Sequence, residues 1–127
     1  MTSGEQPNKT VAEVQSDRDA KMADRTLLDE LTGFDPEFAE LFRQFVLDGL
    51  YQRNVLDQKT RELCACAALT VTNALPQLTA HIRGAKREGA TTEEIQEVML
   101  QACVYGGMPH TLQALRLLRN LVAEGKL

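Results

Sequence analysis

Two residues of this chain combine a titratable side chain with apolar surroundings. The stretch that begins at Pro76 and stops at Gly89 predicts a helix with His81 in its middle. In that helix His81 shares an apolar face with Ala85, because residues four apart lie on the same side. A histidine ring gains and loses a proton near neutral pH. A half-buried imidazole at this position is therefore the first candidate for proton-transfer chemistry.

Glu62 is the second candidate, because it lies at the edge of an apolar helical run, residues 63–69. A carboxylate beside such a dry segment is desolvated, which suits proton transfer. If the two helices pack antiparallel, Glu62 would orient one ring nitrogen of His81 and leave the other for a substrate. Sequence spacing leaves two alternatives open: a solvated Glu62 beside Lys59, and a His81 held in the core by its neighbours.

A glycine-rich break supplies weaker candidates, for substrate binding. Tyr105, Gly106 and Gly107 end a predicted helix, and glycines let the backbone approach a ligand. The same residues also suit a plain turn between two helices. His110 follows in the first turn of the last helix, where the helix dipole disfavours a charged imidazole. It is either a further site residue or a solvent-facing one.

The three cysteines indicate neither a metal site nor a disulfide. Cys64 and Cys66 are two residues apart on a predicted helix, so their side chains diverge by about 200°. They cannot chelate one metal together, and burial is the favoured role for both and for Cys103. Metal binding at His81 would need further ligands nearby, and its neighbours in the sequence supply none. We therefore expect no metal and no cofactor.

Length and charge narrow the class of protein. The 127 residues suit one domain, and the net charge of −4 argues against nucleic acid as a partner. The longest apolar run is too short to cross a membrane, and no signal peptide is visible. An odd number of cysteines without such a signal favours reduced thiols. We therefore expect a cytoplasmic protein without membrane contact.

The hydrophobic pattern predicts helices throughout residues 25–127 and no strand. Residues 1–24 are polar and are expected to form a flexible or arm-like segment. Asp35 and Asp57 are expected N-caps, and the helix after Asp35 has a wide apolar face that we interpret as core. This face consists of Phe38, Leu41, Phe42, Phe45 and Val46. The predicted fold is all-α, a compact bundle of about five or six helices.

Two segments carry more apolar surface than a small monomer covers. Residues 63–69 are apolar on all sides, and the last predicted helix runs from Pro109 to about Ala123 with a leucine face of unusual width. Surface of this kind favours a homo-oligomer.

Several short motifs occur in an order and at a spacing that resemble the carboxymuconolactone decarboxylase family. The similarity extends over roughly residues 27–122. The motifs are Thr60-Arg61-Glu62-Leu63, His81-Ile82-Arg83-Gly84-Ala85, Gly89, Glu93-Glu94-Ile95-Gln96-Glu97-Val98 and Val104-Tyr105-Gly106-Gly107-Met108-Pro109. The segment Phe34-Asp35-Pro36-Glu37-Phe38 is similar to the 4-carboxymuconolactone decarboxylases themselves.

The resemblance implies an alkyl hydroperoxidase D-like fold that assembles as a homotrimer or homohexamer, with sites near subunit contacts. Peroxidases of the same superfamily carry a C-x-x-C motif before the helical histidine. Ala74 and Gln77 stand at those two positions here, so disulfide chemistry has no nucleophile. Pro76 and Gln77 also replace an acidic pair usual in the decarboxylases, and His110 replaces a small residue. These departures leave the fold unaffected and the substrate open.

By this resemblance we expect a cofactor-independent carboxy-lyase that acts on a γ-carboxy unsaturated lactone such as 4-carboxymuconolactone. His81 would donate the proton to the dienolate, with Glu62 as its partner or proton shuttle. Tyr105, Gly106 and Gly107 would line the pocket. The alternative is a related lyase, isomerase or cyclase for another enolisable carbonyl compound. A thiol peroxidase, or a non-catalytic assembly protein with a structural His81, ranks lower.

Overall fold

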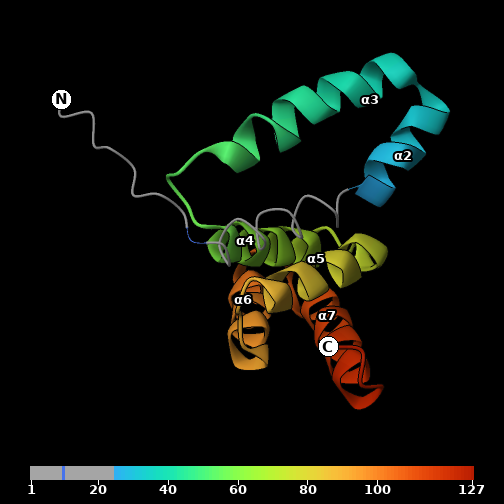
Figure 1. The fold of residues 1–127 in the computed structure, drawn as a ribbon. Coiled ribbons are helices and arrows are strands. Elements are labelled where there is room, and N and C mark those ends of the chain that lie inside the picture. Colours follow the sequence, from blue (N-terminus) through green and yellow to red (C-terminus); the bar gives the residue numbers. More distant parts are fainter. Residues whose placement is uncertain (1–9, 11–24) are drawn as a thin grey trace.

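The computed structural model describes Thr10 and residues 25–127, and every regular element in this part of the chain is helical (Figure 1). The α-helices are α2 (Arg25–Phe34), α3 (Pro36–Phe42), α4 (Gln58–Val71), α5 (Leu75–Arg87), α6 (Thr92–Gly106) and α7 (Met108–Ala123). A π-helical turn, η1 (Arg43–Leu47), and a 3-10 turn, η2 (Leu50–Gln52), follow α3. The all-α prediction is confirmed. The expected flexible segment 1–24 lies, apart from Thr10, outside the described residues.

Helices α4 and α5 form a helical hairpin at the centre of the fold (Figure 1). The Asp57 side chain accepts a hydrogen bond of 2.7 Å from the Thr60 backbone N–H and so caps the start of α4. Asn73 adopts a positive φ of 56° in the turn between the helices. Gly89 ends the hairpin with a φ of 92°, the left-handed conformation that favours glycine after a helix.

Helices α6 and α7 pack beneath this hairpin. Thr91 and Glu94 form a capping box, with hydrogen bonds of 3.0 and 3.1 Å between each side chain and the other residue's backbone N–H. Gly107 separates α6 from α7 with a φ of 87° and a ψ of 160°, which excludes other residues. The four helices enclose one apolar core, built around Cys66, Leu78, Ile82, Ala85, Ala90, Ile95, Met99, Ala114, Leu118 and Leu121.

Helices α2 and α3 together with η1 and η2 form an arm, residues 25–52, that stands off the four-helix core (Figure 1). α2 contacts α3, and α3 continues into η1, whereas none of these elements makes more than slight contact with α4 to α7. Asp35 caps α3 as predicted, by accepting from the Phe38 backbone N–H at 3.1 Å.

The prediction that the helix after Asp35 belongs to the core is wrong for three of its five apolar residues, whereas Phe42 and Val46 are partly buried. Phe38, Leu41 and Phe45 are 54%, 56% and 71% exposed. Their spacing correctly indicated an amphipathic helix, but spacing does not say which surface covers the apolar side. Among residues 25–127, none of the core helices α4 to α7 makes more than slight contact with the arm. Within the described part of the chain, the arm therefore presents an exposed apolar row.

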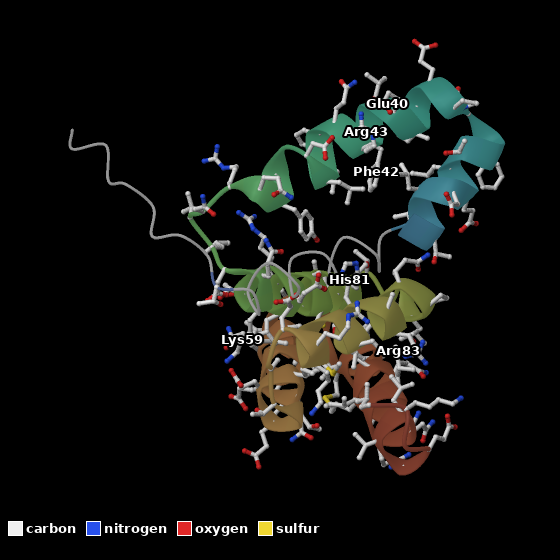
Figure 2. The ribbon with its side chains drawn as sticks, viewed as in Figure 1. Glu40, Phe42, Arg43, Lys59, His81 and Arg83 are labelled. Carbon is white, nitrogen blue, oxygen red and sulfur yellow. The ribbon has the colours of Figure 1, made fainter. Side chains whose placement is uncertain are left out.

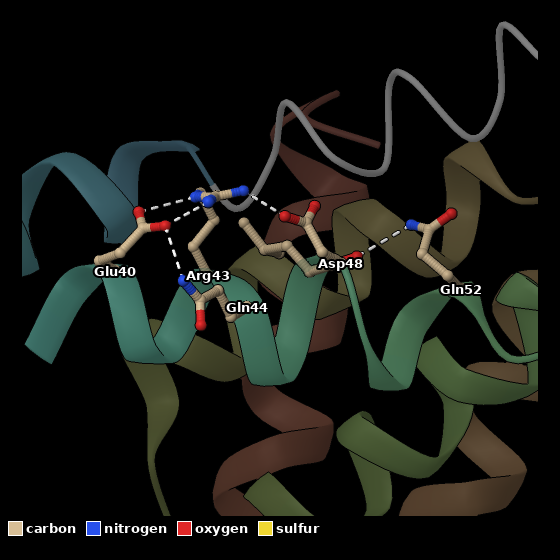
Figure 3. Close-up of polar contacts among 6 residues, drawn as sticks. Glu40, Arg43, Gln44, Asp48 and Gln52 are labelled. Carbon is tan, nitrogen blue, oxygen red and sulfur yellow. Dashed lines mark hydrogen bonds and ion pairs between the residues drawn. The ribbon is translucent and has the colours of Figure 1, made fainter.

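The arm carries a network of polar contacts around Arg43 (Figure 3). The Arg43 guanidinium pairs with Glu40 one turn earlier and with Asp48 just beyond η1. Gln44 also donates to Glu40, at 3.0 Å. These donors lower the pKa of Glu40 to about 2, with the Arg43 hydrogen bond as the largest cause. The network spans the change from α-helical to π-helical geometry at Arg43.

None of the described helices combines the length and hydrophobicity that a membrane crossing requires.

Candidate functional site

Of the two predicted catalytic residues, Glu62 lies in the second turn of α4 and is 5% exposed. Glutamate is rarely buried to this degree unless its carboxylate has a partner. Lys59 is not that partner, because its Nζ pairs with Glu94 at 2.8 Å and so links the starts of α4 and α6. The alternative of a solvated Glu62 beside Lys59 is therefore wrong.

The partner of Glu62 is His81, which lies nineteen residues further along the chain on α5. The Nδ1 atom of His81 is 2.7 Å from Oε2 of Glu62. Nδ1 donates in this contact, since an ionised carboxylate only accepts. The structure thus joins the two residues whose contact the sequence spacing left open.

The two partners differ in their access to solvent. The His81 side chain is 23% exposed, whereas the Glu62 side chain is 7% exposed. His81 lies on the side of α5 that faces the arm, and Arg83 lies on the opposite side (Figure 2). A nearly buried carboxylate therefore holds a ring that is partly exposed. This is the arrangement in which an oriented imidazole exchanges a proton with a ligand.

Gly84 completes this geometry, and the sequence reasoning missed its role. It is buried one turn after His81 on α5. A Cβ atom at this position would lie only 2.7 Å from Oε2 of Glu62 and 2.9 Å from its Cδ. The carboxylate therefore rests where an ordinary side chain would begin. A glycine in the interior of a helix is itself destabilising, and that was the signal that could have marked it.

Cys66 lies one turn after Glu62 on the buried side of α4 and is fully buried. Burial raises the pKa of its thiol to about 12, and the negative charge of Glu62 contributes. The thiol therefore stays protonated at neutral pH, which matches the structural role predicted for it. Cys64 is exposed, Cys103 is partly buried, and all three cysteines are free.

The candidates for substrate binding gather at the other end of α4. Tyr105 is 75% exposed. A Cβ atom on Gly106 would lie 2.9 Å from Cα of Val71, so this glycine permits close packing of α6 on the end of α4. The Nδ1 atom of His110 donates to the Val71 carbonyl oxygen at 2.8 Å. His110 is thus half-buried and satisfies a carbonyl at the C-terminal end of a helix.

The structure does not bring these candidates to the Glu62–His81 pair within one chain. Val71 follows Glu62 by nine residues, which is about 13 Å along the helix axis. Tyr105, Gly106, Gly107 and His110 therefore remain predictions for substrate binding, and none supports the pair directly. Figure 1 shows the junction of α6 and α7 beneath the hairpin, on the side away from the arm.

The two positions that hold cysteines in the related peroxidases also lie near the start of α5. Ala74 is its N-cap and Gln77 is an exposed residue of its first turn. Among residues 25–127, no group of three or more histidine, cysteine or acidic side chains has a geometry that could hold a metal ion. The described site itself contributes a carboxylate and an imidazole among apolar helices.

Comparison with known proteins identifies the family to which the sequence is similar. A sequence model of the carboxymuconolactone decarboxylase family matches residues 36–120, which include α3 to most of α7 and both members of the pair. A nitrosuccinic acid decarboxylase of Metarhizium robertsii is 32% identical over 91 residues, 68% of this chain and 64% of that protein. A 4-carboxymuconolactone decarboxylase of Acinetobacter baylyi is 26% identical over 97 residues, 76% of this chain and 72% of that protein.

An uncharacterized 15.0 kDa protein of Paracoccus denitrificans is 41% identical over 76 residues, 58% of this chain and 57% of that protein. The chain thus spans about three fifths of the length of this relative and of the Metarhizium protein.

Proposed function

Because the chain belongs to the carboxymuconolactone decarboxylase family, we propose that it is a decarboxylase that works by proton transfer from its own side chains. The observation that carries the proposal is the 2.7 Å contact between the buried Glu62 carboxylate and the partly exposed His81 ring. Such a pair supplies a positioned proton, which is what a reaction of this class needs from the protein.

The names of two relatives indicate the class of substrate. One is named for 4-carboxymuconolactone and the other for nitrosuccinic acid. Both compounds carry a carboxylate together with an electron-withdrawing group, an unsaturated lactone in one case and a nitro group in the other. That group takes up the electrons released when the carboxylate departs, so no separate electron sink is needed. We propose that the substrate of this protein is an acid of this kind, and a γ-carboxy unsaturated lactone first of all.

The reaction on such a lactone begins with loss of the carboxylate as carbon dioxide. The carbon–carbon bond breaks, and its electron pair moves into the unsaturated lactone to give a dienolate. His81 in its imidazolium form then donates a proton to the carbon of this dienolate that completes the product. Glu62, bound at Nδ1, stabilises the charged ring before the transfer and keeps it in a fixed orientation. The neutral ring regains a proton from solvent for the next turnover.

A second function uses the same pair on a different compound. By their names, the two relatives act on chemically different acids, so similarity to them does not fix one substrate. A lyase, isomerase or cyclase for another enolisable carbonyl compound would also need a proton positioned by Glu62 and His81. Loss of carbon dioxide is the property that separates this alternative from a decarboxylase.

We also propose that the protein assembles with copies of itself. The apolar row on the arm consists of Phe34, Phe38, Leu41 and Phe45, which are at least 54% exposed. The arm, residues 25–52, contains six acidic residues and two arginines, whereas α7 contains two arginines and no acidic residue. Leu112, Arg116 and Arg119 lie exposed on α7. An acidic, apolar arm from one copy therefore suits α7 of another in both charge and hydrophobicity.

The decarboxylase proposal can be tested by incubating the protein with 4-carboxymuconolactone and with nitrosuccinic acid in deuterated water. We expect release of carbon dioxide from at least one of them, with one deuterium on the product carbon that accepts the proton. His81→Asn is the control for catalysis by the pair. A product that forms without carbon dioxide would support the isomerase or cyclase alternative. Turnover that is equal with and without His81 would contradict the proposal.

A further inference from the structure

We infer that Gly84 is a positioning residue for the acid–base pair: it gives Glu62 the space from which its carboxylate can hold His81. The expected effect on turnover depends on the proposed function. The geometric part of the inference depends only on the described contacts.

The argument begins with one oxygen atom. Oε2 of Glu62 is the atom that accepts from Nδ1 of His81 at 2.7 Å. The same Oε2 is the atom that a Cβ on Gly84 would approach most closely, also at 2.7 Å. Cδ of Glu62 would be at 2.9 Å from that Cβ and Oε1 at 3.4 Å. A methyl group at position 84 would therefore displace the oxygen that binds the histidine.

The displacement would fall on the carboxylate rather than on the helices. The nearest atoms belong to the far end of the flexible Glu62 side chain, and no backbone atom of α4 is among the three nearest. A side chain turns about its own bonds more easily than two packed helices separate. We therefore expect Gly84→Ala to leave the fold intact and to move the Glu62 carboxylate away from Nδ1.

Helix propensity strengthens the inference. Glycine in the interior of a helix is less favourable than alanine, so a glycine that merely filled the helix would gain from the substitution. Gly84 lies in the interior of α5, three residues before its last residue, and is buried against α4. The clearance required by Glu62 is the physical reason for a glycine at this position.

The chain offers a matched control in Gly33. This residue is also helical, near the end of α2, and a Cβ atom built on it would meet nothing within 4 Å. Gly33→Ala should therefore stabilise its helix without effect on the pair.

The test compares Gly84→Ala, Glu62→Gln and Gly33→Ala by ¹⁵N NMR of the histidine rings and by turnover. The chain has only two histidines, so His110→Gln identifies the signals of His81. In the parent protein the ring signals should show a proton fixed on Nδ1. We expect Gly84→Ala to shift the His81 signals toward those of Glu62→Gln, and Gly33→Ala to leave them unchanged. Unchanged His81 signals in Gly84→Ala would overturn the inference.

Turnover provides the second arm. Gly84→Ala should lower kcat by about a hundredfold, the cost of a misplacement of about 1 Å. In the Glu62→Gln background the same substitution should cost little more, since it acts through Glu62. Equal losses in both backgrounds would overturn the inference. If no substrate is turned over at all, the proposed function fails while the NMR result still decides the role of Gly84.

Glu62→Asp supplies a rescue variant that also covers failure of Gly84→Ala to fold. The shorter aspartate side chain would withdraw the carboxylate by about 1.5 Å, the length of one carbon–carbon bond, and so make room for the methyl group. Gly84→Ala should therefore lower the melting temperature less in the Glu62→Asp background than in the parent protein. If the double variant loses more melting temperature than the two single variants together, the proposed crowding is contradicted.

Discussion

The Glu62–His81 contact places a charged group where water is scarce and a titratable ring where water still reaches. A buried carboxylate that loses its partner retains a large desolvation cost, because the rest of the site offers it little compensation. Because of this cost, the carboxylate keeps its contact with His81. The ring, which is the more exposed partner, is the one that exchanges a proton with its surroundings. The pair is therefore better suited to repeated proton transfer than an exposed histidine and glutamate would be.

The reactivity of the Cys66 thiol measures how well the region around Glu62 excludes water. Its pKa of about 12 means that the thiolate is scarce at pH 8, and burial also blocks access to it. We expect a thiol reagent at pH 8 to modify the exposed Cys64 rapidly and to leave Cys66 unmodified in the native protein. Mass spectrometry of proteolytic peptides measures the modification of each cysteine. Modification of Cys66 at the rate of Cys64 would show that the region around Glu62 opens to solvent.

The candidate residues themselves could be predicted from the sequence, but their geometry could be predicted only in part. His81 and Glu62 were identifiable because each has a titratable side chain at the edge of an apolar helix. Their contact depends on the rotation of α4 against α5, which no local pattern determines. The role of Gly84 depends on the same rotation. His110 was ambiguous for a similar reason, since its partner is a backbone carbonyl 39 residues earlier in the sequence.

At the scale of elements, the helix starts illustrate the most predictable features of the chain. Asp35 and Asp57 each cap a helix as predicted, and Thr91 caps a third, because capping depends on residues only three positions apart. The placement of the arm was not predictable in the same way. An amphipathic helix looks identical in sequence whether its apolar side meets its own core or another surface. The exposed apolar side of the arm is therefore explained best by a contact with another molecule.

The Arg43 network gives the arm a dependence on pH. The pKa of Glu40 is lowered from 4.5 to about 2 in the fold, mainly by the hydrogen bond from Arg43. A carboxyl whose pKa is lowered by folding stabilises the fold above its unfolded value, and this stabilisation is lost as the pH falls. We expect the parent protein to melt at a higher temperature than Glu40→Gln at pH 6. The difference should shrink as the pH falls from about 4.5 toward 2.

Calorimetry on the two proteins across this pH range measures the effect. Glu37→Gln is a suitable control, because Glu37 is also an exposed acid on α3. The difference between the parent and Glu40→Gln should be small, since the pair is exposed to solvent. A difference that grows on acidification would contradict the network as described.

At the scale of the whole molecule, the apolar row on the arm stays exposed, because no described core helix makes more than slight contact with the arm. Isolated apolar residues on a surface are ordinary, but Phe38, Leu41 and Phe45 at helical spacing, with Phe34 at the end of α2 just before them, form a patch of the kind that normally faces a partner. The acidic arm and the arginines of α7 allow that partner to be another copy. A contact between two different surfaces closes into a ring when its rotation permits, which is compatible with the expected trimer or hexamer.

Phe45→Ser tests this assembly, because Phe45 is 71% exposed on the row and its loss should cost little within one chain. We expect the parent protein to sediment as an oligomer at micromolar concentration and Phe45→Ser to shift toward the monomer. Val55→Ser is the matched control, since Val55 is 76% exposed in the loop before α4 and lies outside the row. A monomeric parent protein, or equal effects of the two substitutions, would contradict the proposed interface.

The central claim is that Glu62 and His81 act as one catalytic unit, and a double-mutant cycle on turnover tests it most directly. A proton-transfer residue typically contributes about 10²–10⁴ in rate. His81→Asn and Glu62→Gln keep side chains of similar size with some capacity for hydrogen bonding, so both variants should fold. We predict that each lowers kcat within that range on the acid identified as substrate. The double variant should be little worse than either single one. Full activity in a folded His81→Asn variant, or losses that multiply in the double variant, would contradict the claim.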